Sequence, residues 1–123
     1  MALNRVLRLR KNRDYQRVRQ QGRVMASRLL ILAWAPNDQE SLRVGFVVSK
    51  RVSKSAVERN YIKRILSEAI RPLLAELPGG QDLVIRAKGQ AVGVRLPVLT
   101  QELVLLLRRA RLLDSTNSVG PRS

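Results

Sequence analysis

The sequence predicts an α+β fold, in which strands and helices are mixed around one small sheet. Three observations support this prediction. With 123 residues, the chain has the usual size of a single domain with one hydrophobic core. Two stretches typical of strands precede the clearest helical stretch, and a third follows it. Helical stretches also stand near both ends, so the expected order is helix, two strands, helix, strand, helix.

The two ends of the chain predict little regular structure. Residues 1–11 form a basic arm that contains Arg5, Arg8, Arg10 and Lys11 without a regular apolar pattern. Residues 114–123 are small and polar, which is typical of a disordered tail. We therefore expect a single RNA-binding domain over residues 1–113, including the arm.

A short helix is expected over residues 12–21. Asn12 can cap its start, and Gly22 tolerates the left-handed conformation that often follows a helix end. The large apolar side chains of this helix are Tyr15 and Val18. Because so short a helix is marginal in isolation, it must pack on the rest of the domain.

Two strands are expected over residues 24–35 and 42–50, joined by a turn at 36–38 and paired antiparallel. The first is apolar on both parities, as in a strand covered on two faces, and the second alternates. Trp34 in the first strand is either a core residue, the commoner case, or a platform for a base. A third strand is expected over residues 82–87.

The strongest helical signal spans residues 55–77. Ser55 and Glu58 form a capping box at its start, and Pro72 should kink it in its last third. Its apolar residues share an arc of about 100°; they are Ile62, Ile65, Leu66, Ala69 and Leu73. A final helix is expected over residues 97–113, with leucines at helical spacing.

The charge balance points to a polyanionic partner. Lys and Arg total 24 against nine Asp and Glu, a net charge of +15, whereas solubility needs only about 2 to 8. Nucleic acid is the expected partner, because each phosphate that a protein neutralises releases counterions. A membrane is not expected, since the chain has no apolar run of about 18 residues and no signal-peptide layout.

The residues that the sequence lacks restrict its chemistry. There is no Cys and no His, so thiolate nucleophiles, the usual zinc ligands and an imidazole base are excluded. The nine carboxylates are scattered from Asp14 to Asp114 without a metal-binding spacing. We therefore expect no catalytic residue, no metal site and no cofactor bound by the protein alone.

The central helix carries a second face opposite its apolar stripe. Its polar and basic residues lie within about 140° of one another; they are Arg59, Asn60, Lys63 and Arg64, and Arg71 returns to the same arc. Such converging donors can hold phosphates in a fixed register. The alternative is an ordinary solvated face, although only Glu58 and Glu68 lie nearby to balance the charge.

The same helix carries a family resemblance. The segment 49–71, SKRVSKSAVERNYIKRILSEAIR, resembles the signature of the bacterial ribonuclease P protein subunit, approximately VSKK, a linker, and A-V-x-R-N-R-x-K-R. The resemblance extends to KNRDYQRVRQQG in the first helix and to LVIRAKGQA in the third strand. It covers roughly residues 7–112.

The resemblance implies a fold and a function. The fold is an α/β sandwich with a small, mostly antiparallel sheet and a left-handed βαβ crossover, similar to a ribosomal-protein domain. The function is that of a non-catalytic, cytoplasmic subunit that binds ribonuclease P RNA and the 5′ leader of precursor tRNA. The RNA performs the cleavage and holds Mg²⁺, and no small-molecule substrate is implied.

The resemblance also implies two sets of binding residues. Contacts with the catalytic RNA are expected at Lys50, Arg51, Lys54, Arg59, Asn60, Lys63, Arg64 and Arg71. Contacts with the leader are expected in a cleft between the first helix and the sheet, at Lys11, Tyr15, Arg19 and Arg28.

The chain departs from the family pattern at three positions. Tyr61 and Ser67 stand where the family has arginines, and Arg19 replaces a second aromatic residue. Tyr15 itself could serve the core instead of stacking on a base. Two other functions remain open: a ribosomal or assembly-type RNA-binding protein, and a stand-alone metal-dependent ribonuclease.

Overall fold

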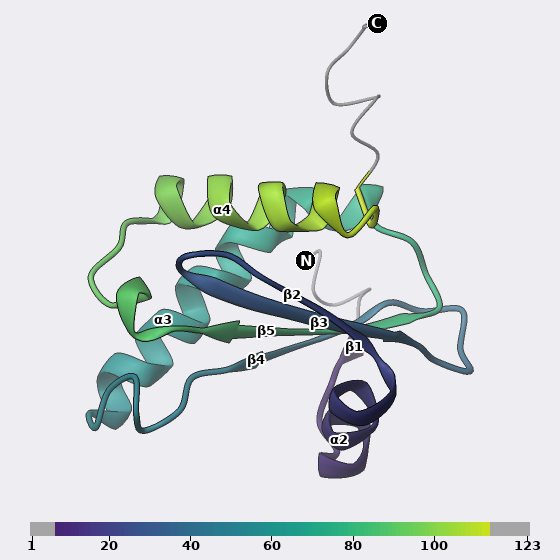
Figure 1. Cartoon of the computed structure of the whole chain (residues 1–123), viewed down its shortest axis with the longest axis horizontal. Coiled ribbons are helices and arrows are strands. Elements are labelled where there is room, and N and C mark those ends of the chain that lie inside the picture. Colours follow the sequence, from purple (N-terminus) through teal and green to yellow (C-terminus); the bar gives the residue numbers. More distant parts are fainter. Residues whose placement is uncertain (1–6, 114–123) are drawn as a thin grey trace, which may run out of the picture.

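The computed structural model describes residues 7–113, which form a five-stranded sheet with helices on both faces (Figure 1). The strands are β1 (Leu7–Arg8), β2 (Arg23–Ala26), β3 (Leu30–Pro36), β4 (Arg43–Val47) and β5 (Gln81–Ala87). The helices are α2 (Asn12–Gln21), α3 (Ala56–Ile70) and α4 (Leu96–Arg109), with short 3-10 helices at Arg71–Glu76 and Gly89–Ala91. The predicted α+β class is confirmed.

The sheet is evenly mixed rather than mostly antiparallel. Its order is β1-β4-β5-β3-β2, with two parallel pairings, β1–β4 and β4–β5, and two antiparallel pairings, β5–β3 and β3–β2. The predicted antiparallel pairing of the two early strands is wrong, because β5 lies between β3 and β4. Leu83 and Ile85 of β5 are buried on one face and Val84 on the other, so this strand takes the centre of the sheet.

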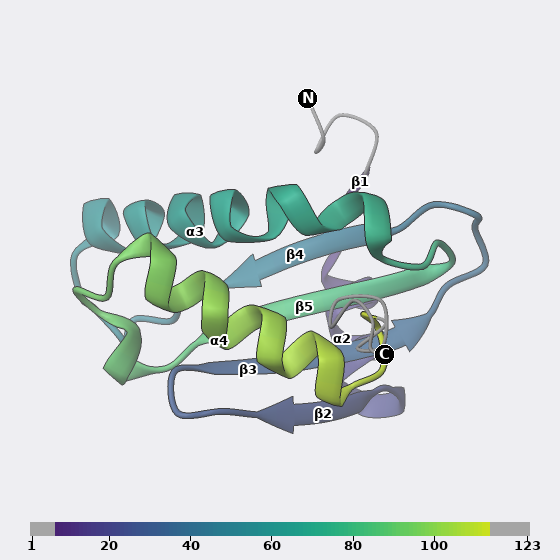
Figure 2. The ribbon, with the colours of Figure 1, turned by 90° about the horizontal axis from the view of Figure 1, so that it is seen from above.

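The connection from β4 through α3 to β5 is left-handed. Figure 2 views the sheet from the side of α3 and α4, and with the strand direction taken as upward the chain steps leftward from β4 to β5. Most such crossovers are right-handed. The expectation that came from the family resemblance is therefore confirmed against the general rule.

The expected strand over residues 24–35 is in fact a hairpin of β2 and β3. Its turn is closed by polar contacts: the Leu30 amide donates to Ser27 Oγ (3.2 Å), and Lys88 Nζ donates to the Ser27 carbonyl (2.7 Å). From α4, the Glu102 carboxylate accepts from the Leu29 amide at 3.2 Å. The turn contains no Gly or Pro, so a continuous strand was the natural reading of its sequence.

The central helix begins as expected and ends earlier. Ser55 Oγ accepts from the Glu58 amide at 3.1 Å, which is one half of the predicted capping box. The α-helix stops at Ile70, and Arg71–Glu76 continue as a 3-10 helix with Pro72 in its first turn. Because Pro72 has no amide hydrogen, the expected kink is realised as a change of helix type.

The last helix is also shorter than predicted. It ends at Arg109 rather than at residue 113, and Arg111 takes a positive φ of 63°. The amides of Leu112 and Leu113 then donate to the Leu107 carbonyl at 2.9 and 3.1 Å. This left-handed turn folds both leucines back onto the core.

The start of the described chain belongs to the sheet rather than to a free arm. Leu7–Arg8 pair with β4, and the Leu9 amide donates to the Val44 carbonyl at 3.1 Å. Residues 1–6 of the expected arm and the expected tail 114–123 lie outside the described residues.

Helix α2 has the predicted bounds but different ends. Lys11, not Asn12, occupies the N-cap, and its side chain makes no capping hydrogen bond. Gly22 has a φ of −85° and is not left-handed. Glycine is needed there because a Cβ would collide with the carbonyl oxygens of Val18 and Trp34.

The apolar core is divided by the sheet. Between the sheet and α3 and α4 lies a large, leucine-rich core. Under α2 lies a small one, formed by Leu9, Val18, Ala35 and Val84 with Tyr15, Ala33 and Val47 packed against it. Because α2 is short, it covers only part of its face and leaves a cleft.

Candidate nucleic-acid interface

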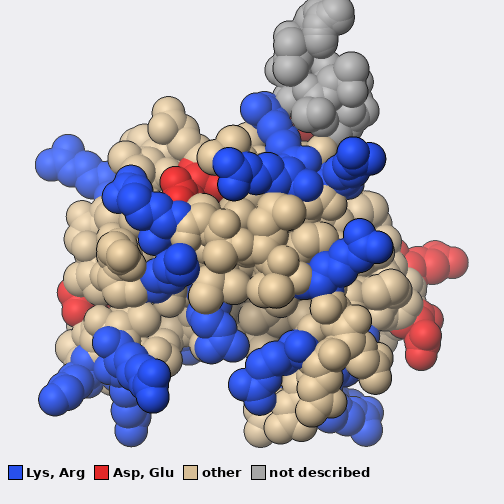
Figure 3. All heavy atoms as spheres, viewed as in Figure 1, with Lys and Arg blue, Asp and Glu red and all other residues tan. Residues whose placement is uncertain are grey.

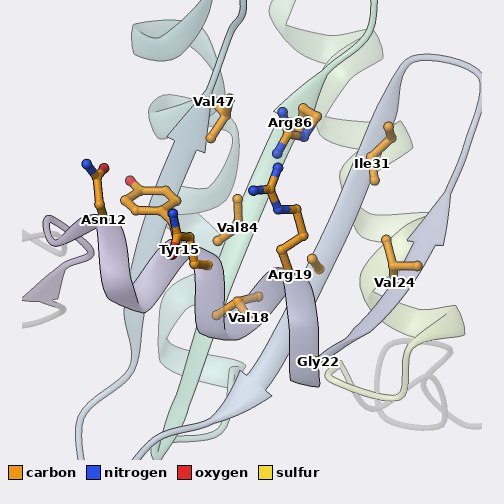
Figure 4. A pocket seen from close by; sticks show the side chains of 12 residues that line it. Asn12, Tyr15, Val18, Arg19, Gly22, Val24, Ile31, Val47, Val84 and Arg86 are labelled. Atoms are coloured by element: carbon orange, nitrogen blue, oxygen red, sulfur yellow. The ribbon is translucent and has the colours of Figure 1, made fainter.

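The cleft lies between α2 and the uncovered part of the sheet (Figure 4). It has a volume of about 710 Å³. Val84, Ala33 and Ile31 contribute apolar surface from the central strands, and Val24 and Val47 add to it. Asn12, Tyr15, Gln16 and Arg19 line the cleft from α2. An apolar floor with polar and aromatic walls suits a base and its backbone better than a uniformly charged surface would.

Tyr15 is held firmly at one end of the cleft. Its hydroxyl donates to the Leu9 carbonyl at 2.9 Å, and its ring lies against Gly45, where any Cβ would collide with it. Burial raises the pKa of the Tyr15 hydroxyl, an effect that the positive charge of Arg8 partly opposes. The ring still lines the cleft, so Tyr15 serves the small core and the cleft at once.

Arg19 and Arg86 place two guanidinium groups in the cleft. Figure 4 shows their heads turned toward one another, Arg19 from α2 and Arg86 from β5. Neither takes part in the salt bridges formed among residues 7–113. Sequence reasoning missed Arg86, although the alternation of the strand indicated its position. Arg86 and Val84 are two residues apart and point to the same face of the sheet, opposite the face of the core residues Leu83 and Ile85.

Two predicted leader contacts do not line the cleft. Lys11 precedes α2. It lines a separate pocket on the side of α2 away from the cleft, together with Arg13 and Arg17. Arg28 is exposed in the turn between β2 and β3, because the chain reverses there before β3 runs along the cleft. The structure therefore brings together Tyr15 and Arg19 of the predicted set, and adds Arg86.

Trp34 is a core residue. It is partly buried and packs against the large core, on the face of the sheet opposite the cleft. Of the two interpretations that the sequence left open, the commoner one holds.

The cationic face of α3 borders a second groove. This groove has a volume of about 740 Å³ and lies between α3 and the β1–β4 edge of the sheet. Its lining includes four of the predicted residues, Asn60, Lys63, Arg64 and Arg71, together with Arg8 and Arg10 from the N-terminal segment. Tyr15 lines this groove as well as the cleft, so the two surfaces adjoin at its ring.

The remaining predicted contacts lie near the start of α3. Lys50, Arg51 and Lys54 are exposed in the loop before the helix. Arg59 differs from its neighbours, because its guanidinium donates to the Ser53 carbonyl at 2.9 Å and so holds this loop. Figure 3 shows Lys and Arg side chains spread over the visible face, with few Asp or Glu among them.

A buried ion network fixes α2 to the sheet, and sequence reasoning missed it. Asp82 of β5 is completely buried and accepts two hydrogen bonds of 2.8 Å from Arg43, one of 2.8 Å from Asn37, and a further one from Arg17 of α2. The hydrogen bond between Arg43 and the Asp82 carboxylate raises the pKa of Arg43. Arg17 also donates to the Pro36 carbonyl at 2.7 Å. The network therefore sets where α2 lies over the cleft.

Within the described part of the chain, no helix is long and apolar enough to cross a membrane. Over the same residues, no three Asp or Glu side chains come together in a group that could hold a metal ion.

Comparisons of the sequence with known proteins give matches to one family. The family model for Ribonuclease P matches residues 3–111. A ribonuclease P protein component from Chloroflexus aurantiacus is 41% identical over 124 residues, covering 98% of this chain and 91% of the relative. One from Roseiflexus castenholzii is 38% identical over 120 residues, covering 97% and 98%.

Solved structures show the same fold. The RNase P protein of Staphylococcus aureus superimposes with a TM-score of 0.80 at 26% identity, covering 89% of this chain and 99% of that one. The protein from Thermotoga maritima gives 0.75 at 25% identity, covering 83% and 96%. Because the family model matches nearly the whole length of this chain, the chain belongs to the ribonuclease P protein family.

Proposed function

We propose that this ribonuclease P protein component acts in tRNA processing through two adjoining RNA-binding surfaces with different partners. The cleft under α2 binds the single-stranded 5′ leader of precursor tRNA. The cationic face of α3 binds the ribonuclease P RNA. The observation that carries the proposal is the cleft itself, where Tyr15, Arg19 and Arg86 surround an apolar floor.

The composition of the cleft favours a single strand. Unpaired bases can stack on an aromatic ring and lie on apolar surface, while cations follow the phosphates. Tyr15 offers a ring that its hydrogen bond to Leu9 holds in place. Arg19 and Arg86 offer two guanidinium groups, each of which can donate a pair of hydrogen bonds to phosphate oxygens. Mature tRNA has no leader, so this surface would raise the affinity for the precursor alone.

The face of α3 favours a structured RNA. Asn60, Lys63 and Arg64 are exposed on one rigid helix, which fixes the spacing of their donors. Arg71 continues the row into the 3-10 helix. Such contacts to phosphates position an RNA without reading its sequence.

We propose further that the RNA performs the cleavage and holds the Mg²⁺ ions. Several carboxylates of this chain already have protein partners: Asp14 and Asp82 lie beside Arg17 and Arg43, and Glu102 binds the β2–β3 turn. Mg²⁺ commonly takes carboxylate and phosphate oxygens. The RNA supplies the phosphates, and the protein acts in the cytoplasm as a binding subunit.

Reconstitution with and without a leader tests this function. The protein is combined with a bacterial ribonuclease P RNA, and its effect on the affinity for precursor and mature tRNA is measured. We expect the protein to strengthen precursor binding and to leave mature tRNA nearly unaffected. An equal gain for both would favour an assembly-type RNA-binding protein, and cleavage by purified protein without RNA would favour an autonomous ribonuclease.

A further inference from the structure

Tyr61 is an exposed aromatic residue on the helix that we assign to the catalytic RNA. Its side chain is 57% exposed, and Val57, one turn before it, is 80% exposed. Its hydroxyl has no hydrogen-bond partner among the described residues. Nothing in the packing of α3 requires a ring at this position, because the buried residues of the helix are Ile62, Leu66, Ala69 and Ile70.

The neighbours of Tyr61 on the helix surface combine both charges. Arg64 follows at i+3, so its guanidinium can reach the same nucleotide as the ring. Glu58 precedes at i−3, and Glu68 lies within about 20° of Tyr61 around the helix axis. Two carboxylates on this flank repel a phosphate, but they do not repel the neutral face of a base. The flank therefore suits a base, and the face beyond Arg64 suits the backbone.

We propose that Tyr61 stacks on an unpaired base of the ribonuclease P RNA, next to a phosphate held by Arg64. The inference rests on the proposed function, in which α3 binds this RNA. It assigns a stacking contact to a position where the signature that segment 49–71 resembles has an arginine, so that a ring contact would stand in place of a charge contact. Stacking tolerates any base, because every base has a π-face.

The test compares variants at three positions of α3 for binding to the ribonuclease P RNA of Chloroflexus aurantiacus over a series of KCl concentrations. Tyr61→Ala should weaken binding about 5- to 150-fold, the loss typical of one base on one ring. Tyr61→Phe should stay within about twofold of the wild type, because it keeps the ring. Val57→Ala is the matched control on the same exposed flank, and it should have no effect.

The salt dependence separates a ring contact from a charge contact. Tyr61→Ala should shift the binding curve without changing its salt slope, whereas Arg64→Ala should reduce the slope by about 0.7 to 0.9. Thermal unfolding of all variants should match the wild type, because these side chains lie outside the core.

Three results would overturn the stacking contact. They are binding by Tyr61→Ala within twofold of the wild type, an equal loss in Tyr61→Phe, which would assign the effect to the hydroxyl, and a reduced salt slope in Tyr61→Ala. In each case a normal loss in Arg64→Ala leaves the proposed function of α3 standing. An unchanged affinity and slope in Arg64→Ala would instead count against that function.

Discussion

The two faces of the sheet are built in opposite ways. On one face, α3 and α4 enclose a continuous core in which leucines from both helices are completely buried. On the other, α2 contributes Val18 and part of Tyr15 to a small core and leaves a cleft of about 710 Å³ beside it. The face covered by α3 and α4 buries the apolar area that stabilises the fold. The face covered by α2 keeps the side chains of the cleft accessible to a ligand.

The difference shows how a small domain can keep a binding cleft open. A short helix with so little buried apolar area is weakly held by the hydrophobic effect. The contact of Arg17 with Asp82 attaches α2 to the sheet by a polar interaction, in addition to its small apolar contact. Breaking that attachment should therefore have the largest effect on the cleft side.

Removing the central carboxylate tests the attachment. Asp82→Asn keeps the shape of the side chain but removes the buried counter-charge of Arg17 and Arg43, which keep only their longer contacts with Asp14. We expect the free energy of unfolding to fall by about 3–5 kcal/mol, as for other buried pairs that lose one partner. Arg17 is 27% exposed, which favours the lower end of this range.

Urea unfolding measures this change, with the exposed Asp38→Asn as a control that should lie within about 0.5 kcal/mol of the wild type. A loss below about 1 kcal/mol for Asp82→Asn, as in surface ion pairs, would show that the network does not hold α2.

The large core should determine stability without determining selectivity. Leu103 of α4 is completely buried, and Leu103→Ala should reduce the free energy of unfolding by about 2–5 kcal/mol. The ratio of precursor to mature tRNA affinity should stay unchanged at a temperature where the variant is folded. Val24→Ala, at a cleft position that is 66% exposed, should cost almost no stability. A changed affinity ratio in Leu103→Ala would weaken the division between the two faces.

Tyr15 contributes to both the small core and the cleft, so its variants should separate the two roles. Tyr15→Ala should weaken precursor binding by the reconstituted enzyme by about 1–3 kcal/mol and leave mature tRNA nearly unaffected. Tyr15→Phe keeps the ring and loses the hydrogen bond to Leu9, which should cost about 0.5–1.5 kcal/mol of stability but little leader affinity. Equal losses for both tRNAs in Tyr15→Ala would make Tyr15 a packing residue only.

A small pH effect is expected on the other side of the sheet. Hydrogen bonds from Ser27 and the Leu29 amide lower the pKa of Glu102 below its ordinary value of 4.5. A lowered pKa in the folded state means that the ionised carboxylate stabilises the protein at neutral pH and that this contribution fades as the pH falls below 4.5. Glu102→Gln should therefore show a flatter loss of stability in acid than the wild type in urea unfolding. Parallel pH profiles would contradict the role of this contact.

The sequence predicted the class, the helices and the exposed cationic face of α3 because these depend on local periodicity. It mispredicted the strand order because pairing depends on which strand is buried on both faces, a property that β5 shows only in the assembled sheet. The left-handed crossover came from the family resemblance, since general rules favour the other hand. Asp82 and Arg86 were missed because the apolar residues of their strand dominated its interpretation.

The most direct test of two separate surfaces replaces one cationic side chain on each surface with alanine. Arg86→Ala removes a guanidinium from the cleft, and Lys63→Ala removes an ammonium group from the α3 groove. For each variant, the affinity for ribonuclease P RNA and the precursor-to-mature affinity ratio of the saturated complex are measured. We expect Arg86→Ala to lower the ratio with RNA affinity intact, and Lys63→Ala to lower RNA affinity with the ratio intact. If each variant lowered both quantities equally, the cleft and the α3 face would be one surface, and the division proposed for this protein would be wrong.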